Sequence, residues 1–98
     1  MTIKKTLEQT KLCLAPVGRL DTATAPELEK ELVGSLEGVR ELVLDLKELS
    51  YISSAGLRVI LKAQKLMGGK GGMKISGANE MVMEVFEITG FADILSFE

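Results

Sequence analysis

The segment Glu41–Leu46, ELVLDL, constrains the fold more than any other part of the chain. Its continuous apolar run from Leu42 to Leu44 is typical of a β-strand that is buried on both faces. Strand-like segments and segments with helical spacing alternate on either side of it, which favours an α/β domain. Because single helices separate most of the strands, we expect largely parallel pairing with right-handed crossovers.

Shorter segments with alternating apolar residues are typical of the other strands of such a sheet. We expect these strands at Ile3–Leu7, Lys11–Val17, Met73–Ser76 and Ile94–Phe97. A hairpin at Gln9–Thr10 would join the first two, and Pro16 and Gly18 would end or distort the second. The prediction is a mixed, mostly parallel sheet of four to five strands with three to four α-helices.

The first helix is expected to start within Asp21–Thr24. Either Asp21 or Thr24 is a candidate N-cap, and Glu27 completes a capping-box pattern with Thr24. Leu28 and Leu32 then follow helical spacing, so one face of this helix should lie on the sheet.

Two further helices are expected in the second half of the chain. One runs from about Ser54 to Met67, and the other has Asn79 as N-cap and Gly90 as the glycine after its last turn. Apolar positions on the central strand and on these two helices should meet in one core. We expect Leu44, Ile60 and Phe86 to be buried there.

Length and composition limit the classes of protein that the chain can represent. The 98 residues predict one domain, 1–98. A net charge of −2, from 12 basic and 14 acidic residues, and 4% aromatic residues argue against direct binding to nucleic acid. No apolar run reaches the ~18 residues of a membrane span, and Met1–Gln9 lacks the apolar centre of a signal peptide. We therefore expect no membrane contact and a cytoplasmic location.

The residue types limit the chemistry in the same way. With no His, a Ser–His–Asp or Cys–His mechanism lacks its base, and the single cysteine, Cys13, rules out a zinc site built on His and Cys. Asp21, Asp45 and Asp93 lie in three separate segments without metal-binding spacing. The glycine-rich run at 68–72 lacks the spacing of a phosphate-binding loop. We expect no enzyme activity, no metal and no cofactor.

The segment Leu49–Leu61, LSYISSAGLRVIL, holds the strongest functional candidate. Ser53 and Ser54 lie between a strand and a helix start, where unpaired N–H groups and the helix dipole stabilise a phosphate. Ser53 is the better-placed N-cap, which leaves the hydroxyl of Ser54 freer to accept one. The small residues Ala55 and Gly56 would let a partner approach closely, and Arg58, four residues after Ser54, is placed to pair with a phosphoserine.

At these residues the chain resembles the STAS domain, the fold of bacterial anti-sigma factor antagonists and of the cytosolic tails of sulphate transporters. The resemblance covers nearly the whole chain. Four blocks in the right order carry it: Gly18–Asp21 with Thr24–Leu28, Leu42–Leu46, Tyr51–Leu57 and Val85–Phe91.

The resemblance implies a phosphate acceptor and a mechanism. In the antagonist branch the loop commonly reads Asp-Ser-Ser/Thr-Gly-Leu, so alignment on Gly56 places the acceptor at Ser54. Ser53 then stands at the aspartate position, which makes it the alternative acceptor, and Ala55 stands at the second hydroxyl position; both depart from the common pattern. The implied mechanism is partner switching: the unphosphorylated protein binds an anti-sigma factor that is also a serine kinase and so releases a sigma factor. The kinase phosphorylates the antagonist, and a PP2C-type phosphatase reverses this.

The resemblance also implies a partner-binding surface at one end of the sheet, where the turn after Gly18 should lie beside the Ser54 loop. The residues expected on this surface are Asp21, Thr22, Ser53, Ser54, Ala55, Gly56 and Arg58.

Two other interpretations remain open from the sequence. The chain is alternatively a constitutive STAS interaction module in a signalling or lipid-transport assembly, which the departures at Ser53 and Ala55 favour. A nucleotide- or anion-binding domain is the second alternative, although no phosphate-binding sequence supports it.

Overall fold

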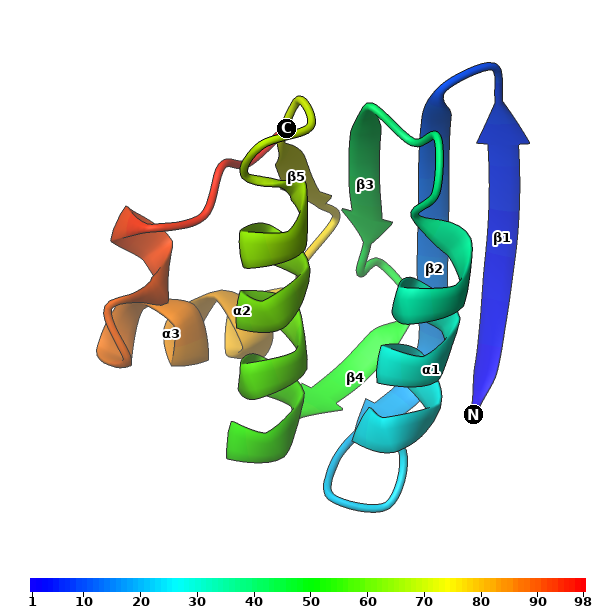
Figure 1. Cartoon of the computed structure of the whole chain (residues 1–98). Helices are drawn as coiled ribbons and strands as arrows, with labels where there is room; N and C mark the ends of the chain where they lie inside the picture. Colours follow the sequence, from blue (N-terminus) through cyan, green and yellow to red (C-terminus); the bar gives the residue numbers. More distant parts are fainter.

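The computed structural model describes residues 1–98 as one mixed sheet with helices packed on it (Figure 1). In chain order the elements are β1 (Thr2–Glu8), β2 (Lys11–Leu20), α1 (Ala25–Ser35), β3 (Glu41–Asp45), β4 (Leu49–Ile52), α2 (Ser54–Met67), β5 (Met73–Ser76), α3 (Glu80–Ile88) and the 3₁₀ turn η1 (Phe91–Asp93).

The sheet has the strand order β1-β2-β3-β5, and β4 pairs with the far end of β2. Only β1 and β2 are antiparallel; the pairs β2–β3, β2–β4 and β3–β5 are parallel. This agrees with the predicted mixed, mostly parallel sheet. The hairpin at Gln9–Thr10 is also confirmed, with Gln9 at a φ of 56°.

The strand β2 is longer than the sequence pattern indicated. It continues through Pro16 and Gly18 to Leu20, with an irregular register between Gly18 and Arg19. Glycine at 18 has a φ of 98°, a conformation that other residues rarely adopt, so it allows β2 to leave β3 and pair with β4. Gly18 therefore distorts the strand without ending it, and Pro16 pairs in regular register with Ile3 of β1.

Two other expectations about local structure need correction, and one strand was not expected. The strand β4 was not predicted as a separate element. The strand expected at Ile94–Phe97 is reduced to one bridge between Ile75 and Phe97, next to η1. The capping box at Thr24 is wrong, because the Thr24 hydroxyl accepts the N–H of Asp21, its own N–H donates to Oδ1 of Asp21, and Glu27 pairs with the N-terminal amine.

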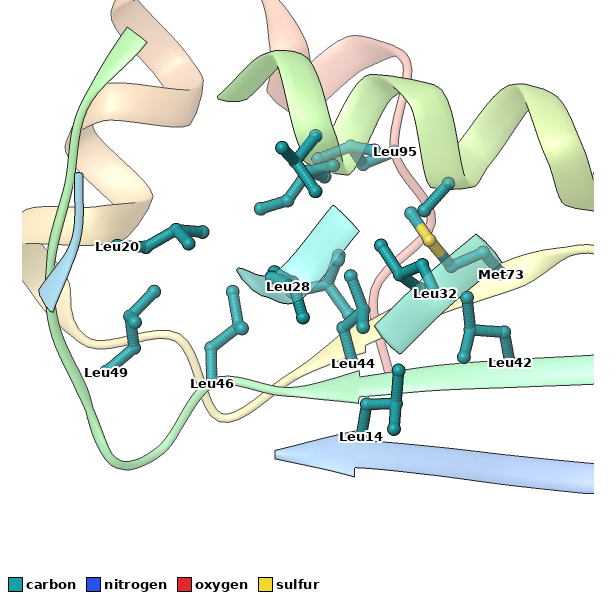
Figure 2. Close-up of a cluster of buried hydrophobic side chains, with 14 of the residues drawn as sticks. Leu14, Leu20, Leu28, Leu32, Leu42, Leu44, Leu46, Leu49, Met73 and Leu95 are labelled. Carbon is teal, nitrogen blue, oxygen red and sulfur yellow. The ribbon is translucent and has the colours of Figure 1, made fainter. Parts of the chain in front are cut away.

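The core lies between one face of the sheet and the helices. In Figure 2, Leu14, Leu42 and Leu44 rise from the strands toward side chains of the helical layer. Leu44, Ile60 and Phe86 are fully buried, as predicted. The central strand is buried on both faces, as expected, since Val43 on the opposite face is only 4% exposed.

The two long helices run side by side over this core. Figure 1 shows α1 and α2 on the same face of the sheet, with both helices beginning at the lower end of the view. The end of β2 and the end of β4 lie at that same end. The longest helix, α2, has 14 residues, and none of the helices combines the length and apolarity that spanning a bilayer requires.

Candidate functional site

The pairing of β2 with β4 brings the predicted site together. Leu20, the last residue of β2, is opposite Ile52, the last residue of β4. The N–H of Ser53 donates to the carbonyl of Leu20 at 2.9 Å, so the chain leaves both strands side by side. The turn that holds Asp21 therefore lies beside the Ser53–Ser54 loop, as predicted.

The two adjacent serines have different roles at the start of α2. Ser53 is the N-cap: its backbone is extended and its hydroxyl oxygen accepts the N–H of Gly56 at 3.4 Å. Ser54 is the first helical residue, its side chain is exposed, and its hydroxyl has no hydrogen-bond partner within the chain. The helix therefore uses the Ser53 hydroxyl and leaves that of Ser54 open to solvent.

Gly56 supports the loop from inside. It is buried, and a Cβ atom at this position would lie 2.8 Å from Cγ of Leu20 and 2.9 Å from Cγ1 of Ile52. Because real Cβ atoms do not come this close to other atoms, only glycine lets α2 start so near the β2–β4 pair. Among the residues predicted for partner binding, Gly56 acts as a positioning residue and offers no exposed side chain.

Asp21 organises the turn between β2 and α1. Its Oδ1 accepts the N–H groups of Ala23 at 3.0 Å and Thr24 at 3.1 Å, and Thr24 returns the contact by accepting the N–H of Asp21 at 2.9 Å. The backbone hydrogen bond from Thr24, with smaller help from the Thr24 hydroxyl, lowers the pKa of Asp21 from its ordinary value of 3.8 against some desolvation. The carboxylate is therefore ionised at neutral pH and only partly exposed.

A stacked pair that the sequence analysis did not identify lies next to Asp21. The guanidinium of Arg19 lies over the ring of Tyr51, 4.1 Å from its centroid, and Nε of Arg19 is 3.7 Å from Oδ2 of Asp21. A cation over an aromatic face is attracted by the ring quadrupole. Only the β2–β4 register brings these two side chains together, so no local pattern in the sequence indicates them.

A groove of about 510 Å³ opens beside this site, between α1 and the first turns of α2. Thr22 and Ala55 lie at its end nearest Ser54, and Arg58 lies on its α2 wall. Arg58 is exposed and is in none of the ion pairs of the structure. The other residues that line the groove are Ala25, Pro26, Glu29, Lys30, Val33 and Val59.

The geometry therefore gathers the predicted partner-binding residues at one end of the domain. Asp21, Thr22, Ser54, Ala55 and Arg58 surround the start of α2, with Ser53 as its cap. No group of three or more His, Cys, Asp or Glu side chains is arranged to hold a metal ion. The site offers a free hydroxyl, unpaired helix N–H groups and an uncommitted guanidinium, a combination that suits a phosphoryl group.

Comparison with known families identifies the domain. The model of the STAS domain matches residues 2–98. The chain belongs to the STAS domain family. The predicted family and its α/β fold are thus confirmed.

Two curated relatives of this STAS domain carry informative names. BtrV of Bordetella bronchiseptica, assigned by name to the anti-sigma factor antagonists, is 46% identical over 79 residues, which cover 79% of this chain and 68% of that protein. The anti-sigma-B factor antagonist of Bacillus subtilis is 35% identical over 79 residues, which cover 80% of this chain and 72% of that protein.

Solved structures share the fold. An anti-sigma factor antagonist from Mycobacterium paratuberculosis superposes with a TM-score of 0.89 at 20% identity, covering 98% of this chain and 83% of that one. The Bacillus antagonist SpoIIAA superposes with a TM-score of 0.76 in both its unphosphorylated form, at 12% identity, and its phosphorylated form, at 13%. These two matches cover 99% of this chain, and 87% and 91% of the SpoIIAA chains.

Proposed function

We propose that this STAS domain is an anti-sigma factor antagonist whose binding is switched by phosphorylation of Ser54. The most direct support comes from the start of α2. Ser53 caps the helix there, and Ser54 presents a free, exposed hydroxyl. The names of the curated relatives support the same function.

In the proposed cycle the unphosphorylated domain binds an anti-sigma factor that is also a serine kinase, and a sigma factor is released. The kinase then transfers the γ-phosphoryl group of ATP to Oγ of Ser54. A Pγ–Oγ bond forms, the bond to ADP breaks and the hydroxyl proton leaves. A PP2C-type phosphatase hydrolyses the phosphoserine and restores binding. The STAS domain itself only accepts the phosphoryl group, and all these steps take place in the cytoplasm.

The surroundings of Ser54 explain how a phosphate would act without unfolding the domain. The N–H groups of Ser54 and Ala55 precede the first hydrogen bond of α2, and the positive end of the helix dipole lies there. Arg58 lies one turn further along with no acidic partner of its own. Inside an interface, the added charge of about −1.5 to −2 must be desolvated, so it weakens the complex while the free domain tolerates it.

The test uses the cognate kinase, ATP, mass spectrometry and a pull-down of the kinase by each variant. Ser54→Ala should abolish phosphorylation and keep kinase binding, because it removes only a hydroxyl. Ser54→Asp should weaken binding partly, since one carboxylate carries less charge than a phosphate. The control Ser53→Ala should still be phosphorylated.

Two results would contradict this proposal. Phosphorylation of Ser54→Ala but not of Ser53→Ala would move the acceptor to Ser53. If no variant gained phosphate, the constitutive interaction module, in a signalling or lipid-transport assembly, would become the better description.

A further inference from the structure

The last quarter of the chain has a charge pattern that the Ser54 site does not use. All 12 basic residues lie at or before Lys74, together with nine acidic residues, so that part carries a net charge of +3. The remaining segment, 75–98, has no Lys or Arg and carries a net charge of −5. Its five acidic residues are Glu80, Glu84, Glu87, Asp93 and Glu98.

Three of these carboxylates lie on α3 without an ion-pair partner. Glu80 and Glu84 are four residues apart, and Glu84 and Glu87 are three apart, so they repel one another on the helix surface. None of the seven ion pairs in the structure involves a residue after Lys62. Glu87 also lies in the last turn, where the helix dipole disfavours negative charge. Only Glu80, in the first turn, is favoured by the helix dipole, and no basic side chain offsets the mutual repulsion of the three carboxylates.

Apolar side chains lie on the same outward side of α3. Val82 and Phe86 point into the core, but Met81 is 50% exposed and Ile88 is 77% exposed. Met81 and Ile88 are seven residues apart and lie on one stripe of the helix surface, with the half-buried Val85 between them. Exposed apolar side chains that are contiguous and rimmed by charge mark interaction surfaces more often than isolated ones do.

We propose that this outward side of α3 is a second docking surface, which takes a basic amphipathic helix of a partner protein. We call it the α3 face; it consists of Met81, Val85 and Ile88, with Glu80, Glu84 and Glu87. Apolar residues of the incoming helix cover the apolar stripe, and its Lys and Arg side chains neutralise the glutamates, as charge complementarity requires.

The α3 face is separate from the Ser54 site. None of its residues lines the groove between α1 and α2. In Figure 1, α3 lies on the side of α2 that faces away from α1. A second copy of this chain is a poorer partner. Its exposed basic stripe, Arg58, Lys62 and Lys65, begins at the Ser54 site, so docking this stripe on the α3 face would cover the Ser54 site of that copy. The proposal therefore goes beyond the antagonist function and does not depend on phosphorylation.

The test measures fluorescence anisotropy of a labelled helical peptide made only of Leu and Lys, with Leu at helical spacing, against the full chain. A peptide of the same composition with shuffled order is the matched probe. We expect the ordered peptide to bind more tightly than the shuffled one and to be weakened by added salt. Glu84→Lys/Glu87→Lys and Ile88→Ser should each weaken binding by about tenfold or more.

Two control variants change the same chemistry elsewhere on the surface. Glu8→Lys/Glu37→Lys reverses two exposed, unpaired charges, and Leu7→Ser removes a side chain that is 57% exposed on β1. Both should leave peptide binding unchanged. Circular dichroism checks that every variant is folded, as expected for changes at exposed positions.

Three results would overturn the proposal. One is equal binding of the ordered and shuffled peptides. The second is equal loss in the control and α3 variants. The third is a self-associated wild type in sedimentation that Ile88→Ser converts to monomer, which would make the α3 face a contact between copies.

Discussion

The Cα atom of Gly56 lies against the side chain of Leu20, so closely that a methyl group at position 56 would come within 2.8 Å of Cγ of Leu20. This contact joins the end of β2 to the first turn of α2. It fixes the distance between the turn that contains Asp21 and the hydroxyl of Ser54. The position of the proposed switch thus depends on a residue that presents no side chain to a partner.

Gly56→Ala tests this contact. The added methyl group must push Leu20 and Ile52 aside, and overpacking of this kind costs about 1–3 kcal/mol in the free energy of unfolding. Gly34→Ala is the matched control, because Gly34 lies within α1 and nothing lies within 4 Å of its added Cβ. That change should stabilise the domain by up to about 1 kcal/mol. Urea unfolding of both variants gives the comparison, and equal stabilities would contradict the assigned contact.

Ser53→Ala should be more costly to stability than Ser54→Ala. Loss of the cap should lower the free energy of unfolding by about 0.5–1 kcal/mol, at the low end because the 3.4 Å bond to Gly56 is long. Ser54→Ala should change it by less than about 0.5 kcal/mol. Asn79→Ala provides the scale: its side chain accepts the N–H of Val82 at 2.8 Å and donates to the carbonyl of Leu49. In thermal unfolding, Asn79→Ala should have the lowest midpoint temperature, followed by Ser53→Ala and then Ser54→Ala. If Ser54→Ala were less stable than Ser53→Ala, Ser54 and not Ser53 would be the N-cap.

Phe86→Ala tests the core under α3. Phe86 is fully buried and its ring lies 6.0 Å from that of Phe97, so truncation should cost about 3–5 kcal/mol. Ile88→Ala, two residues away and 77% exposed, should change stability by less than about 0.5 kcal/mol. Urea unfolding measures both changes. If Phe86→Ala were as stable as the wild type, the packing of α3 on the core through Phe86 would be wrong.

Asp21 should make stability depend on pH. Its pKa in the folded state lies below the ordinary 3.8, because Thr24 donates hydrogen bonds to the charged form. Its contribution is therefore fully present above the unfolded pKa and is lost as the pH falls through the lower folded pKa. The stability difference between the wild type and Asp21→Asn should be constant near neutral pH and shrink below 3.8. Urea unfolding across this range checks it, and a difference independent of pH would contradict the assignment.

The sequence predicted the elements with strong local signals. Ser54–Met67 has a good N-cap and a stop at Gly68, and Met73–Ser76 lies between a glycine run and the cap Asn79, so their bounds are those of α2 and β5. The strand β4 has only four residues and alternates weakly, because its stability comes from pairing with β2. Local spacing contains no information about that partner.

The same limit applies to the candidate site. The contrast between Ser53 and Ser54 follows from their order before a helix, so sequence reasoning reached it. The stacking of Arg19 on Tyr51 depends on the register of two strands that are distant in the sequence. The capping box failed at Thr24 because Asp21 takes both of its contacts: the Thr24 hydroxyl accepts the N–H of Asp21, and the Thr24 N–H donates to Oδ1 of Asp21.

The division of β2 between two partners has a consequence for how the domain opens. Its first part, Lys11–Leu14, pairs with β3 in the core, and its last part, Gly18–Leu20, pairs with β4 beside the switch. Because the two regions are consecutive parts of one strand, we expect them to open together. In hydrogen–deuterium exchange, the amides paired between β2 and β4 should exchange as slowly as those of the core, whereas exchange should become fast beyond Leu20 at Thr22, whose N–H has no partner in the turn. A kinase that engages Ser54 would then meet a pre-formed surface and would not have to wait for it to fold.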